Sequence, residues 1–375
     1  MRVGIVGCGN VGLRAFIPAV IATEGLQLVA VADPTPSRLG AAAEAGGLES
    51  GALHLNWSEL IARPDVDAVI VATPQQARPE IAIAAAAAGK HLLCEKPLAA
   101  APADATRMVD AARQQGVLLA TVHNYQFLSV YEDLKQIVTS GEIGELEVAT
   151  LNFLSVEDRP GAGDYRPRWR HDVAQSGGGV LMDMLHAVYL GFWLFDARPT
   201  RVSAYVDRRR DDSGDVEDIA LVRYDVPGGC VMVNMAWGEG PGGVDLMGTA
   251  GRALLVTERH GTHPFVAPSC IRVVGRHGER TFPPEPNGRT GHACTVENFR
   301  DAVLNLAPAA ATGEDGVAVL EAVVGAYESA TLEREVHLPL SPDDPVYRRG
   351  ALGVSELAVP IDNRVRQRGL FGFTA

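Results

Sequence analysis

The fold is decided by the stretch Val3-Gly4-Ile5-Val6-Gly7-Cys8-Gly9-Asn10-Val11-Gly12. A short apolar run leads into three glycines spaced Gly-x-Gly-x-x-Gly, and an amphipathic helical pattern continues from there to about Thr23. The next apolar run, Leu26–Ala32, ends at Asp33, roughly 20 residues after Gly12. A strand, a glycine turn, a helix and a second strand closed by an acidic residue together predict a dinucleotide-binding βαβ unit.

Each of the three glycines in the turn is needed for a different physical reason. Gly7 permits the tight turn, Gly9 lets the backbone approach a pyrophosphate, and Gly12 allows the helix to pack closely on the strand. The exposed N–H groups at Asn10 and Val11, with the positive end of the helix, would then hold the pyrophosphate. The alternative interpretation is a glycine-rich turn of an α/β domain that binds no dinucleotide.

The acidic residue at the end of the second strand selects between the two nicotinamide dinucleotides. Asp33 would accept hydrogen bonds from the adenosine ribose hydroxyls and would repel a 2′-phosphate. We therefore expect NAD as the cofactor in preference to NADP. Arg38 opposes this expectation, because its guanidinium could reach a phosphate or stack on the adenine.

The rest of the chain shows two successive patterns. Residues 1–122 alternate apolar runs with helical patterns, which predicts a doubly wound parallel sheet, a Rossmann-type α/β domain. Residues 123–338 hold alternating strands separated by turn residues, together with helices, which predicts an α+β domain with a largely antiparallel sheet. One continuous apolar helix is expected after Gly179, as far as about Leu194. Residues 339–375 form a tail without a clear period.

The composition limits the classes of function. The chain has 375 residues, with 33 Lys and Arg against 46 Asp and Glu, which gives a net charge of −13. This acidic balance disfavours nucleic acids and anionic membrane surfaces as partners. No apolar run reaches the roughly 18 residues of a membrane span, and the first residues leave no room for a signal peptide. Five scattered cysteines without a C-x-x-C pair indicate reduced thiols in a cytoplasmic protein.

Further motifs follow the glycine turn in a fixed order. They are Ala32-Asp33-Pro34, Val71-Ala72-Thr73-Pro74, Cys94-Glu95-Lys96-Pro97-Leu98, Gly141-Glu142-Ile143-Gly144, Trp169-Arg170-x-Asp172 and Ser176-Gly177-Gly178-Gly179-Val180-Leu181-Met182-Asp183. With the glycine turn, this set resembles the Gfo/Idh/MocA oxidoreductases over about residues 1–340. The resemblance implies a Rossmann domain followed by an open-faced sheet domain for substrate and oligomerisation. It also implies oxidation or reduction of a sugar, cyclitol or similar polyol at a carbon that bears a hydroxyl or ketone.

The resemblance implies a site around the E-K-P motif. Lys96 would lie beside the nicotinamide and bond the reacting oxygen, while Glu95 and Pro97 would shape its turn. Thr73 and Pro74 would lie along the nicotinamide ribose. An ammonium with three donors suits a developing alkoxide. The alternative interpretation of Lys96 is a solvated lysine at the surface.

A second set of candidates follows the glycine-rich motif. By resemblance, Asp183 and His186 would face the substrate, and the imidazole is the best general acid or base because its intrinsic pKa is about 6.5. Spacing i, i+3 on one predicted helix puts both on one face, so Asp183 could orient the imidazole or hold a substrate hydroxyl. The alternative is a structural helix histidine packed beside Tyr189 and Trp193.

Neighbouring loops supply further candidates for substrate binding. Trp169 and Arg170 would flank the substrate, and Arg170 could donate to hydroxyls or a carboxylate. His171 is an alternative acid or base, although an exposed loop histidine is the simpler interpretation. His123 and Asn124 end the last Rossmann strand, where a polyol could reach them, and a satisfied core hydrogen bond is equally plausible.

Four features depart from the family pattern. The family usually spaces the Asp and His by four, whereas here Asp183 and His186 are three apart. Tyr189 stands where a second Asp is usual, Gln126 where Arg is frequent, and Arg78 where His is frequent. Because these positions line the cofactor and substrate in the family, they leave the identity of the substrate and the activity itself open.

Two other clusters of polar residues are not predicted to form a functional site. His260 and His263 lack a nearby third ligand, so no metal centre is expected. The arginines within Asp207–Asp212 are most simply a solvated hairpin tip. The apolar residues near the end of the tail, which include Leu370 and Phe371, favour cover of a sheet edge or subunit interface, and we expect a homodimer or homotetramer.

The sequence therefore predicts an NAD-dependent oxidoreductase that transfers a hydride between nicotinamide and a polyol carbon. Two alternatives stay open. One is an enzyme that cleaves or eliminates a glycoside through transient oxidation by tightly held NAD. The other is a non-catalytic dinucleotide-binding regulator on the same fold, which the altered spacing before His186 keeps in view.

Overall fold

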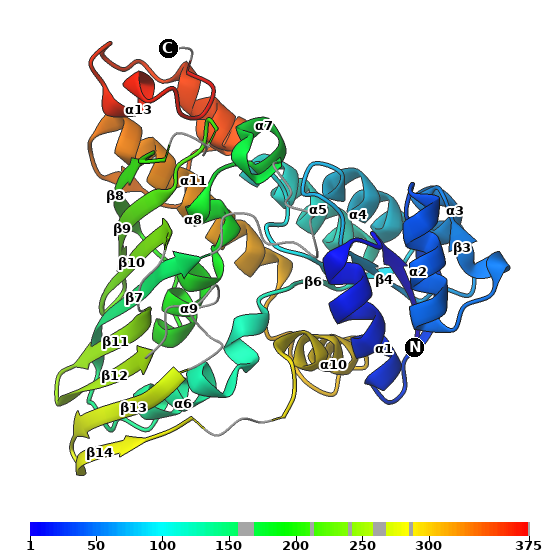
Figure 1. Ribbon diagram of the computed structural model, residues 1–375, viewed down its shortest axis with the longest axis horizontal. Coiled ribbons are helices and arrows are strands. Elements are labelled where there is room, and N and C mark those ends of the chain that lie inside the picture. Colours follow the sequence, from blue (N-terminus) through cyan, green and yellow to red (C-terminus); the bar gives the residue numbers. More distant parts are fainter. Residues whose placement is uncertain (157–168, 211–213, 239–241, 258–267, 285–287, 374–375) are drawn as a thin grey trace. The chain divides into compact units, whose positions relative to one another are not determined.

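The chain folds into two compact units (Figure 1). The computed structural model describes residues 1–156, 169–210, 214–238, 242–257, 268–284 and 288–373. The first unit comprises Met1–Phe127 and Gly288–Val317, and the second comprises Leu128–Asn287 and Ala318–Ala375. The expected boundary at 122/123 assigned Gly288–Val317 to the second domain and left the tail apart. The structure groups that segment with the first unit and the tail with the second.

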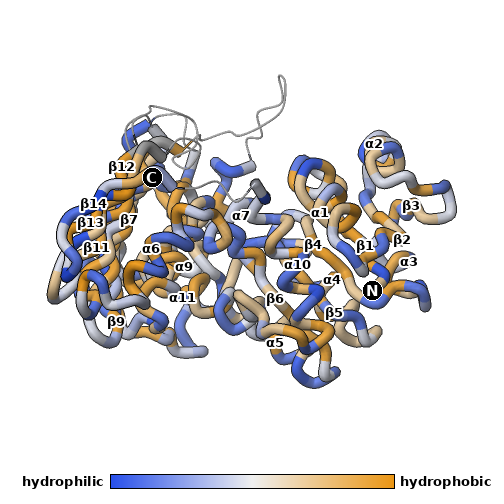
Figure 2. The backbone as a smooth tube through the Cα atoms, turned by 90° about the horizontal axis from the view of Figure 1, so that it is seen from below, coloured by the Kyte–Doolittle hydropathy of each residue, from blue (hydrophilic) through white to orange (hydrophobic). Residues whose placement is uncertain are grey.

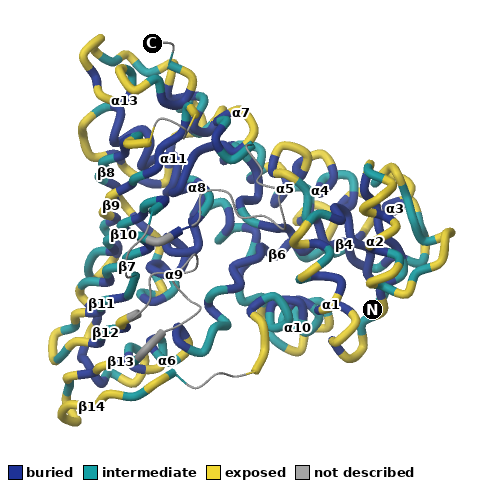
Figure 3. The backbone as a smooth tube through the Cα atoms, in the orientation of Figure 1, coloured by how far each residue is buried: buried dark blue, intermediate teal, exposed yellow. Residues whose placement is uncertain are grey.

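The first unit is built on a six-stranded sheet in the order β3-β2-β1-β4-β5-β6, with every described pairing parallel. The strands are β1 (Arg2–Val6), β2 (Gln27–Ala32), β3 (Leu53–His54), β4 (Ala68–Val71), β5 (His91–Cys94) and β6 (Leu119–Thr121). The central strands are hydrophobic and buried (Figures 2 and 3). The predicted doubly wound parallel sheet is therefore confirmed, and the strand order is that of dinucleotide-binding folds.

Helices connect these strands and cover the sheet. They are η1 (Gly12–Phe16), α1 (Ile17–Ala22), α2 (Pro36–Gly46), η2 (Ser50–Ala52), α3 (Trp57–Ile61), α4 (Arg78–Ala87), α5 (Pro102–Gln115), η3 (Asn124–Phe127) and the late α10 (Gly291–Val303). α2 and α5 each begin with proline and stop where a glycine, Gly47 or Gly116, takes a left-handed conformation.

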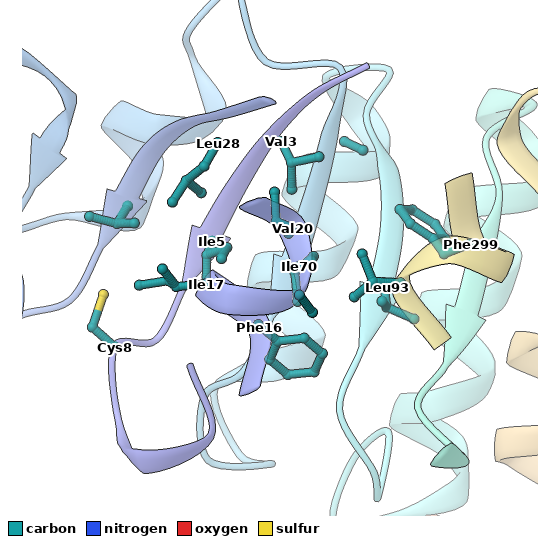
Figure 4. Packing of buried hydrophobic residues seen from close by; sticks show 14 of the residues in the cluster. Val3, Ile5, Cys8, Phe16, Ile17, Val20, Leu28, Ile70, Leu93 and Phe299 are labelled. Carbon is teal, nitrogen blue, oxygen red and sulfur yellow. The ribbon is translucent and has the colours of Figure 1, made fainter. Parts of the chain in front are cut away.

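The late helix α10 completes the core of the first unit. Its residues Val296 and Phe299 are buried in one cluster with Phe16 and Ile17 of the first crossover and Leu93 of β5. Figure 4 shows Phe299 projecting from α10 toward the strands. A segment almost 300 residues away in sequence thus closes the apolar surface that the βαβ units leave.

We predict that Phe299→Ala lowers the free energy of unfolding by about 3–5 kcal/mol, because it removes a buried ring and leaves a cavity. Urea denaturation followed by circular dichroism measures the change. The matched control is Leu306→Ala, since Leu306 is 72% exposed just beyond α10 and its loss should change stability by less than about 0.5 kcal/mol. Equal effects of the two variants would contradict the packing of α10 described above.

The second unit is built on a nine-stranded sheet in the order β14-β13-β12-β11-β7-β10-β9-β8-β15. The strands are β7 (Leu146–Val156), β8 (Arg201–Asp207), β9 (Ile219–Val226), β10 (Gly229–Trp237), β11 (Gly243–Gly248), β12 (Gly251–Thr257), β13 (Pro268–Gly275), β14 (Gly278–Phe282) and β15 (Val336–His337). The predicted antiparallel character is confirmed, with one exception: β10 pairs with β7 in parallel.

One face of this second sheet is buried and the other is open. Burial alternates along β9 and β10, as expected when side chains of successive residues point to opposite faces. The helices of the unit are α6 (Ser129–Thr139), η4 (Trp169–His171), α7 (Val173–Ser176), α8 (Val180–Asp183), α9 (His186–Phe195), α11 (Gly313–Leu332, which begins in the first unit), α12 (Pro345–Arg349), η5 (Gly350–Glu356) and α13 (Arg364–Gln367). Of these, α9 packs on β7 and β10.

Among the described residues, no single helix is long and apolar enough to cross a membrane. The pair Val173–Asp183 and His186–Phe195 reaches that length and composition only together, with a bend of 46° between the two parts.

Candidate active-site residues

The glycine turn has the shape expected of a phosphate cradle. Gly7 has φ +102°, and a Cβ there would lie 2.6 Å from the carbonyl oxygen of Ala72. A Cβ on Gly12 would collide with the carbonyl oxygen of Gly7. By contrast, a Cβ on Gly9 would meet nothing within 4 Å. The protein itself therefore requires glycine at the first and third positions, whereas the second leaves open space that fits a ligand close to the backbone.

The neighbouring residues frame this open space. Asn10 and Val11 are exposed on the turn. Asp33 is buried at the end of β2, where its Oδ2 accepts from the N–H of Cys8 and its Oδ1 from the N–H of Thr35, both at 2.9 Å. Each carboxylate oxygen keeps a lone pair for a further donor. The structure thus holds the acidic residue rigidly beside the glycine turn.

A positive group also stands beside Asp33. The Nη1 atom of Arg38 lies 4.0 Å from its Oδ2, and the Arg38 side chain is about half exposed. An exposed arginine at this distance gains little from the pair and can turn toward an anion. The geometry therefore fits both a ribose with free hydroxyls, as in NAD, and a ribose with a 2′-phosphate, as in NADP.

We predict that Gly9→Ala weakens NAD binding at least tenfold, which is about 1.4 kcal/mol, while the melting temperature stays unchanged. The added methyl group meets no protein atom and occupies the open space instead. Calorimetric titration and thermal unfolding measure the two effects. Gly12→Ala is the counterpart, because its Cβ collides with Gly7 and should lower the melting temperature. Unchanged NAD affinity in Gly9→Ala would exclude the cradle.

The E-K-P turn follows β5 and is clamped by an arginine. Arg78, buried at the start of α4, donates from Nε to the carbonyl oxygen of Thr73 at 2.8 Å. Its Nη1 donates to the carbonyl oxygen of Glu95 at 2.8 Å and also to that of Pro97, which follows a cis peptide bond. Burial lowers the pKa of Arg78 to about 10. One guanidinium therefore ties the turn after β4 to the turn after β5.

Thr73 and Pro74 stand on the turn after β4. Pro74 is exposed, and the hydroxyl oxygen of Thr73 is buried with no hydrogen-bond partner among the described residues. A buried hydroxyl without a partner is costly unless a ligand or water satisfies it. This orphaned oxygen fits the expected contact with a ribose hydroxyl.

Lys96 is half-buried and lies among charged and polar groups of the first unit. Its backbone N–H donates to Oε2 of the buried Glu95 at 3.0 Å. Burial, with the nearby Lys96 charge, lowers the pKa of His123 to about 3. Gln126, where the family often has arginine, donates to the carbonyl oxygen of His123 at 3.2 Å. The structure thus gathers His123, Gln126 and the E-K-P turn at the carboxyl edge of the parallel sheet.

The predicted single helix carrying Asp183 and His186 is wrong. α8 ends at Asp183, and α9 begins at His186 after the two linking residues Met184 and Leu185. The two side chains therefore lie on separate helices bent by 46°, not one turn apart on a common face. The reason is tertiary: α8 is anchored at its N-terminus, while the long apolar α9 follows the sheet.

Asp183 is engaged by Arg170 of the preceding segment. The Arg170 guanidinium donates to Oδ1 of Asp183, and it also stacks 4.9 Å from the ring centroid of Trp169. His186 is buried. His171, expected as an exposed loop residue, is buried and stacked on Trp237 with ring centroids 4.9 Å apart. The stacking makes His171 a packing residue of this unit.

Sequence reasoning missed Glu217, which anchors the glycine-rich motif. Its carboxylate accepts from the N–H groups of Gly179 and Leu181 at 2.8 and 3.0 Å, and its own carbonyl accepts from Val180. The Tyr327 hydroxyl donates to the same carboxylate at 2.9 Å. A Cβ on Gly179 would collide with the Glu217 backbone. The Glu217 carboxylate therefore caps the helix that ends in Asp183, and the Glu217 backbone explains why glycine precedes that helix.

We predict that protein stability falls as pH rises from about 5 to 8, and falls less in Glu217→Gln. Burial raises the pKa of Glu217 to about 7, so the folded state holds a proton that the unfolded state has released. That stabilisation is complete below the ordinary carboxyl pKa and is lost as pH rises through 7, an effect of about 3 kcal/mol. Thermal unfolding at each pH measures it.

Glu147→Gln is the control for this titration, since Glu147 is exposed on β7. It should keep the pH dependence of the wild-type protein. Glu321 and Glu328, whose pKa values burial also raises to about 7, add to the fall in both proteins. His123, whose pKa burial lowers to about 3, opposes it equally in both. An identical slope in Glu217→Gln and wild type would contradict the assignment.

The remaining candidate clusters give no site. His260 and His263 lie outside the described residues. Within the part of the chain that the structure describes, no three metal-ligating side chains gather. Arg209 and Arg210 are exposed, as expected of a hairpin tip, and the buried Asp207 pairs with Arg209.

Comparisons with known proteins agree with this architecture. Residues 1–123 match the model of an oxidoreductase family with an NAD-binding Rossmann fold, and residues 131–254 match the Gfo/Idh/MocA C-terminal domain. The chain belongs to the Gfo/Idh/MocA family of oxidoreductases.

Individual relatives differ in the activity they are named for. The 1,5-anhydro-D-fructose reductase of Ensifer adhaerens is 35% identical over 49% of this chain and 53% of its own length. D-xylose 1-dehydrogenase (NADP(+)) 2 of Haloferax volcanii is 29% identical over 90% of this chain and all of its own. The chain spans 51–60% of the length of the first curated relatives it matches.

Solved structures share the fold along most of the chain. The aldose-aldose oxidoreductase from Caulobacter crescentus, complexed with glycerol, superposes with a TM-score of 0.79. The match covers 90% of this chain and 99% of that chain at 24% sequence identity. At this identity the likeness shows the fold alone.

Proposed function

We propose that the protein is an NAD-dependent oxidoreductase that acts on a hydroxyl or keto carbon of a sugar, cyclitol or related polyol. The observation that carries the proposal is Lys96 on the E-K-P turn, at the carboxyl edge of a parallel sheet in an NAD-binding family. Ligands of open α/β sheets bind at this edge. The polyol class is supported by the names of the relatives from Ensifer adhaerens and Haloferax volcanii.

A bound nicotinamide supplies the hydride acceptor or donor for this chemistry. The turn around Gly9 and the N–H groups of Asn10 and Val11 bind the pyrophosphate, and Thr73 and Pro74 flank the ribose. The Lys96 ammonium donates to the reacting oxygen and stabilises its negative charge. Lys96 is thus the proposed catalytic residue of the first unit.

For the second unit we propose that His186 takes the hydroxyl proton in the oxidative direction. Asp183, fixed by Arg170, binds substrate hydroxyls, and Trp169 supplies an apolar surface for the sugar ring. The burial of His186 supports a role in a water-poor site, where proton transfer and electrostatic interactions are strongest. Asn124 is proposed as a further substrate ligand.

The preference for NAD over NADP rests on the fixed carboxylate of Asp33. Arg38 beside it, and the NADP named for the Haloferax volcanii relative, mark the opposing possibility that the assay must test.

We further propose a cytoplasmic homodimer or homotetramer in which the second unit provides the interface. None of the five cysteines forms a disulfide, in keeping with a reducing compartment. Apolar side chains that alternate with the buried positions of the second sheet are exposed: Leu221, Met247, Val256 and Val274. Exposed apolar side chains on several strands of one sheet favour a partner surface.

We predict that purified protein changes nicotinamide absorbance with NAD and a polyol, and that Lys96→Met lowers turnover by about 10²–10³-fold, the cost of one lost charge-stabilising donor. NAD affinity should change little. The assay uses NAD and NADP with hexoses, amino sugars, sugar acids and inositols, and reduced cofactors with the ketones. Arg107→Met, which removes an exposed charge from α5, is the control.

Unchanged turnover in Lys96→Met would exclude the proposed role of Lys96. Copurified NAD with substrate cleavage but no net reduction would replace the proposal with a glycoside-cleaving enzyme. NAD binding without isotope exchange from any polyol would replace it with a dinucleotide-binding regulator.

A further inference from the structure

The E-K-P turn has a second contact that the family motifs do not include. Nε2 of His292, near the start of α10, lies 3.6 Å from Oε1 of Glu95. The other oxygen of Glu95 accepts the N–H of Lys96. Glu95 therefore lies between the backbone of the proposed catalytic lysine and an imidazole from a distant part of the sequence.

The orientation of His292 is fixed by its other ring nitrogen. The amide Nδ2 of Asn124 lies 3.2 Å from Nδ1 of His292. An amide nitrogen only donates, so Nδ1 accepts and the ring proton resides on Nε2, which faces Glu95. If the ring gains a proton, the Asn124 amide can turn and offer its oxygen to Nδ1, so the arrangement accommodates both charge states.

Packing holds the imidazole in this place. The edge of Phe16 meets the His292 ring at a centroid distance of 5.4 Å and an interplanar angle of 86°. Gly291 lies so close to Asn124 that a Cβ there would collide with the Asn124 backbone oxygen. α10 is itself anchored in the core by Phe299. His292 is thus presented to Glu95 by a rigid helix start, as a positioning group must be.

We propose that His292 is a positioning residue of the E-K-P turn, which holds the Glu95 carboxylate in place and charged beside Lys96. This inference rests on the proposed function, because it assigns Lys96 the catalytic role. His292 acts through Glu95 and touches neither Lys96 nor a reacting atom in any contact that the structure gives.

The charge of Glu95 depends on all its neighbours. Burial by itself raises the pKa of Glu95, but the contact with His292 and nearby positive charges outweigh it, so the pKa lies below its usual value. The titratable or charged groups around the carboxylate, one or more from each adjoining segment, are His292, Arg78, Lys96, Tyr125 and Cys94. Loss of the His292 contact should therefore raise the pH at which Glu95 becomes neutral.

The lysine content makes a direct test possible. The chain has three lysines, Lys90, Lys96 and Lys135. Lys90 and Lys135 each donate to two backbone carbonyl groups away from the E-K-P turn. Reductive ¹³C-methylation of the whole protein gives one lysine signal for each residue, and Lys96→Met identifies the signal of Lys96. The chemical shift of that signal reports the charge of Glu95.

We predict that the acid inflection of the Lys96 signal moves to higher pH by about one unit in His292→Phe, which keeps the ring packing and loses the N–H donor. His292→Gln, which keeps a donor, should restore most of the difference. The acid limb of turnover should move the same way wherever turnover is measurable. His337→Phe, an exposed position on β15, is the control.

An unmoved inflection in His292→Phe would overturn the proposal, whatever the enzymatic activity. A moved inflection in a protein without turnover on the polyol panel would retain the positioning of Glu95 and reject the proposed function instead. If His292→Phe does not fold, Asn124→Leu tests the same arrangement, because it removes the donor that orients the ring. Its inflection should move upward by a smaller amount, and no movement would again overturn the proposal.

Discussion

The buried guanidinium of Arg78 is the interaction on which the candidate site depends. It donates to carbonyl oxygens of the turns after β4 and β5, and so fixes the E-K-P turn relative to Thr73. A buried charge of this kind needs hydrogen-bond partners, and three backbone carbonyl groups accept from its Nε and Nη1 atoms. Strands of a parallel sheet end at one edge, and the arginine converts that common edge into a defined surface around Lys96.

The second unit uses a buried carboxylate for a similar purpose. Glu217 accepts the N–H groups at the start of α8, while Tyr327 closes the cluster from α11. Glycine is needed at two positions of the motif before α8, because the Tyr327 side chain lies against Gly178 and the Glu217 backbone lies against Gly179. In both units a conspicuous sequence motif is held by a buried ionisable residue that lies outside the motif.

The sequence predicted the individual helices and strands better than it predicted how they group into the two units. The glycine turn, Asp33 and the alternation of strands with helices predicted the parallel sheet, because each βαβ unit is specified by nearby residues. A returning C-terminal helix was considered for the first domain, but the segment that returns, Gly288–Val317, could not be identified, since an amphipathic helix does not reveal which apolar surface it will cover. The break in the helix between Asp183 and His186 was not predicted either, because the apolar pattern of the sequence continues across it.

The sequence by itself determined the dinucleotide-binding unit, the acidic residue beside its turn and the family to which the chain belongs. These features follow from motifs whose residues lie within a few tens of positions of one another. Over such short separations the backbone geometry of strands, turns and helices determines which residues come together. Only the tertiary structure decided the roles of Arg78, Glu217 and His292. Glu217 and His292 meet partners distant in sequence, and Arg78 joins the turns that follow two different strands. Such contacts depend on how elements pack, which periodicity does not encode.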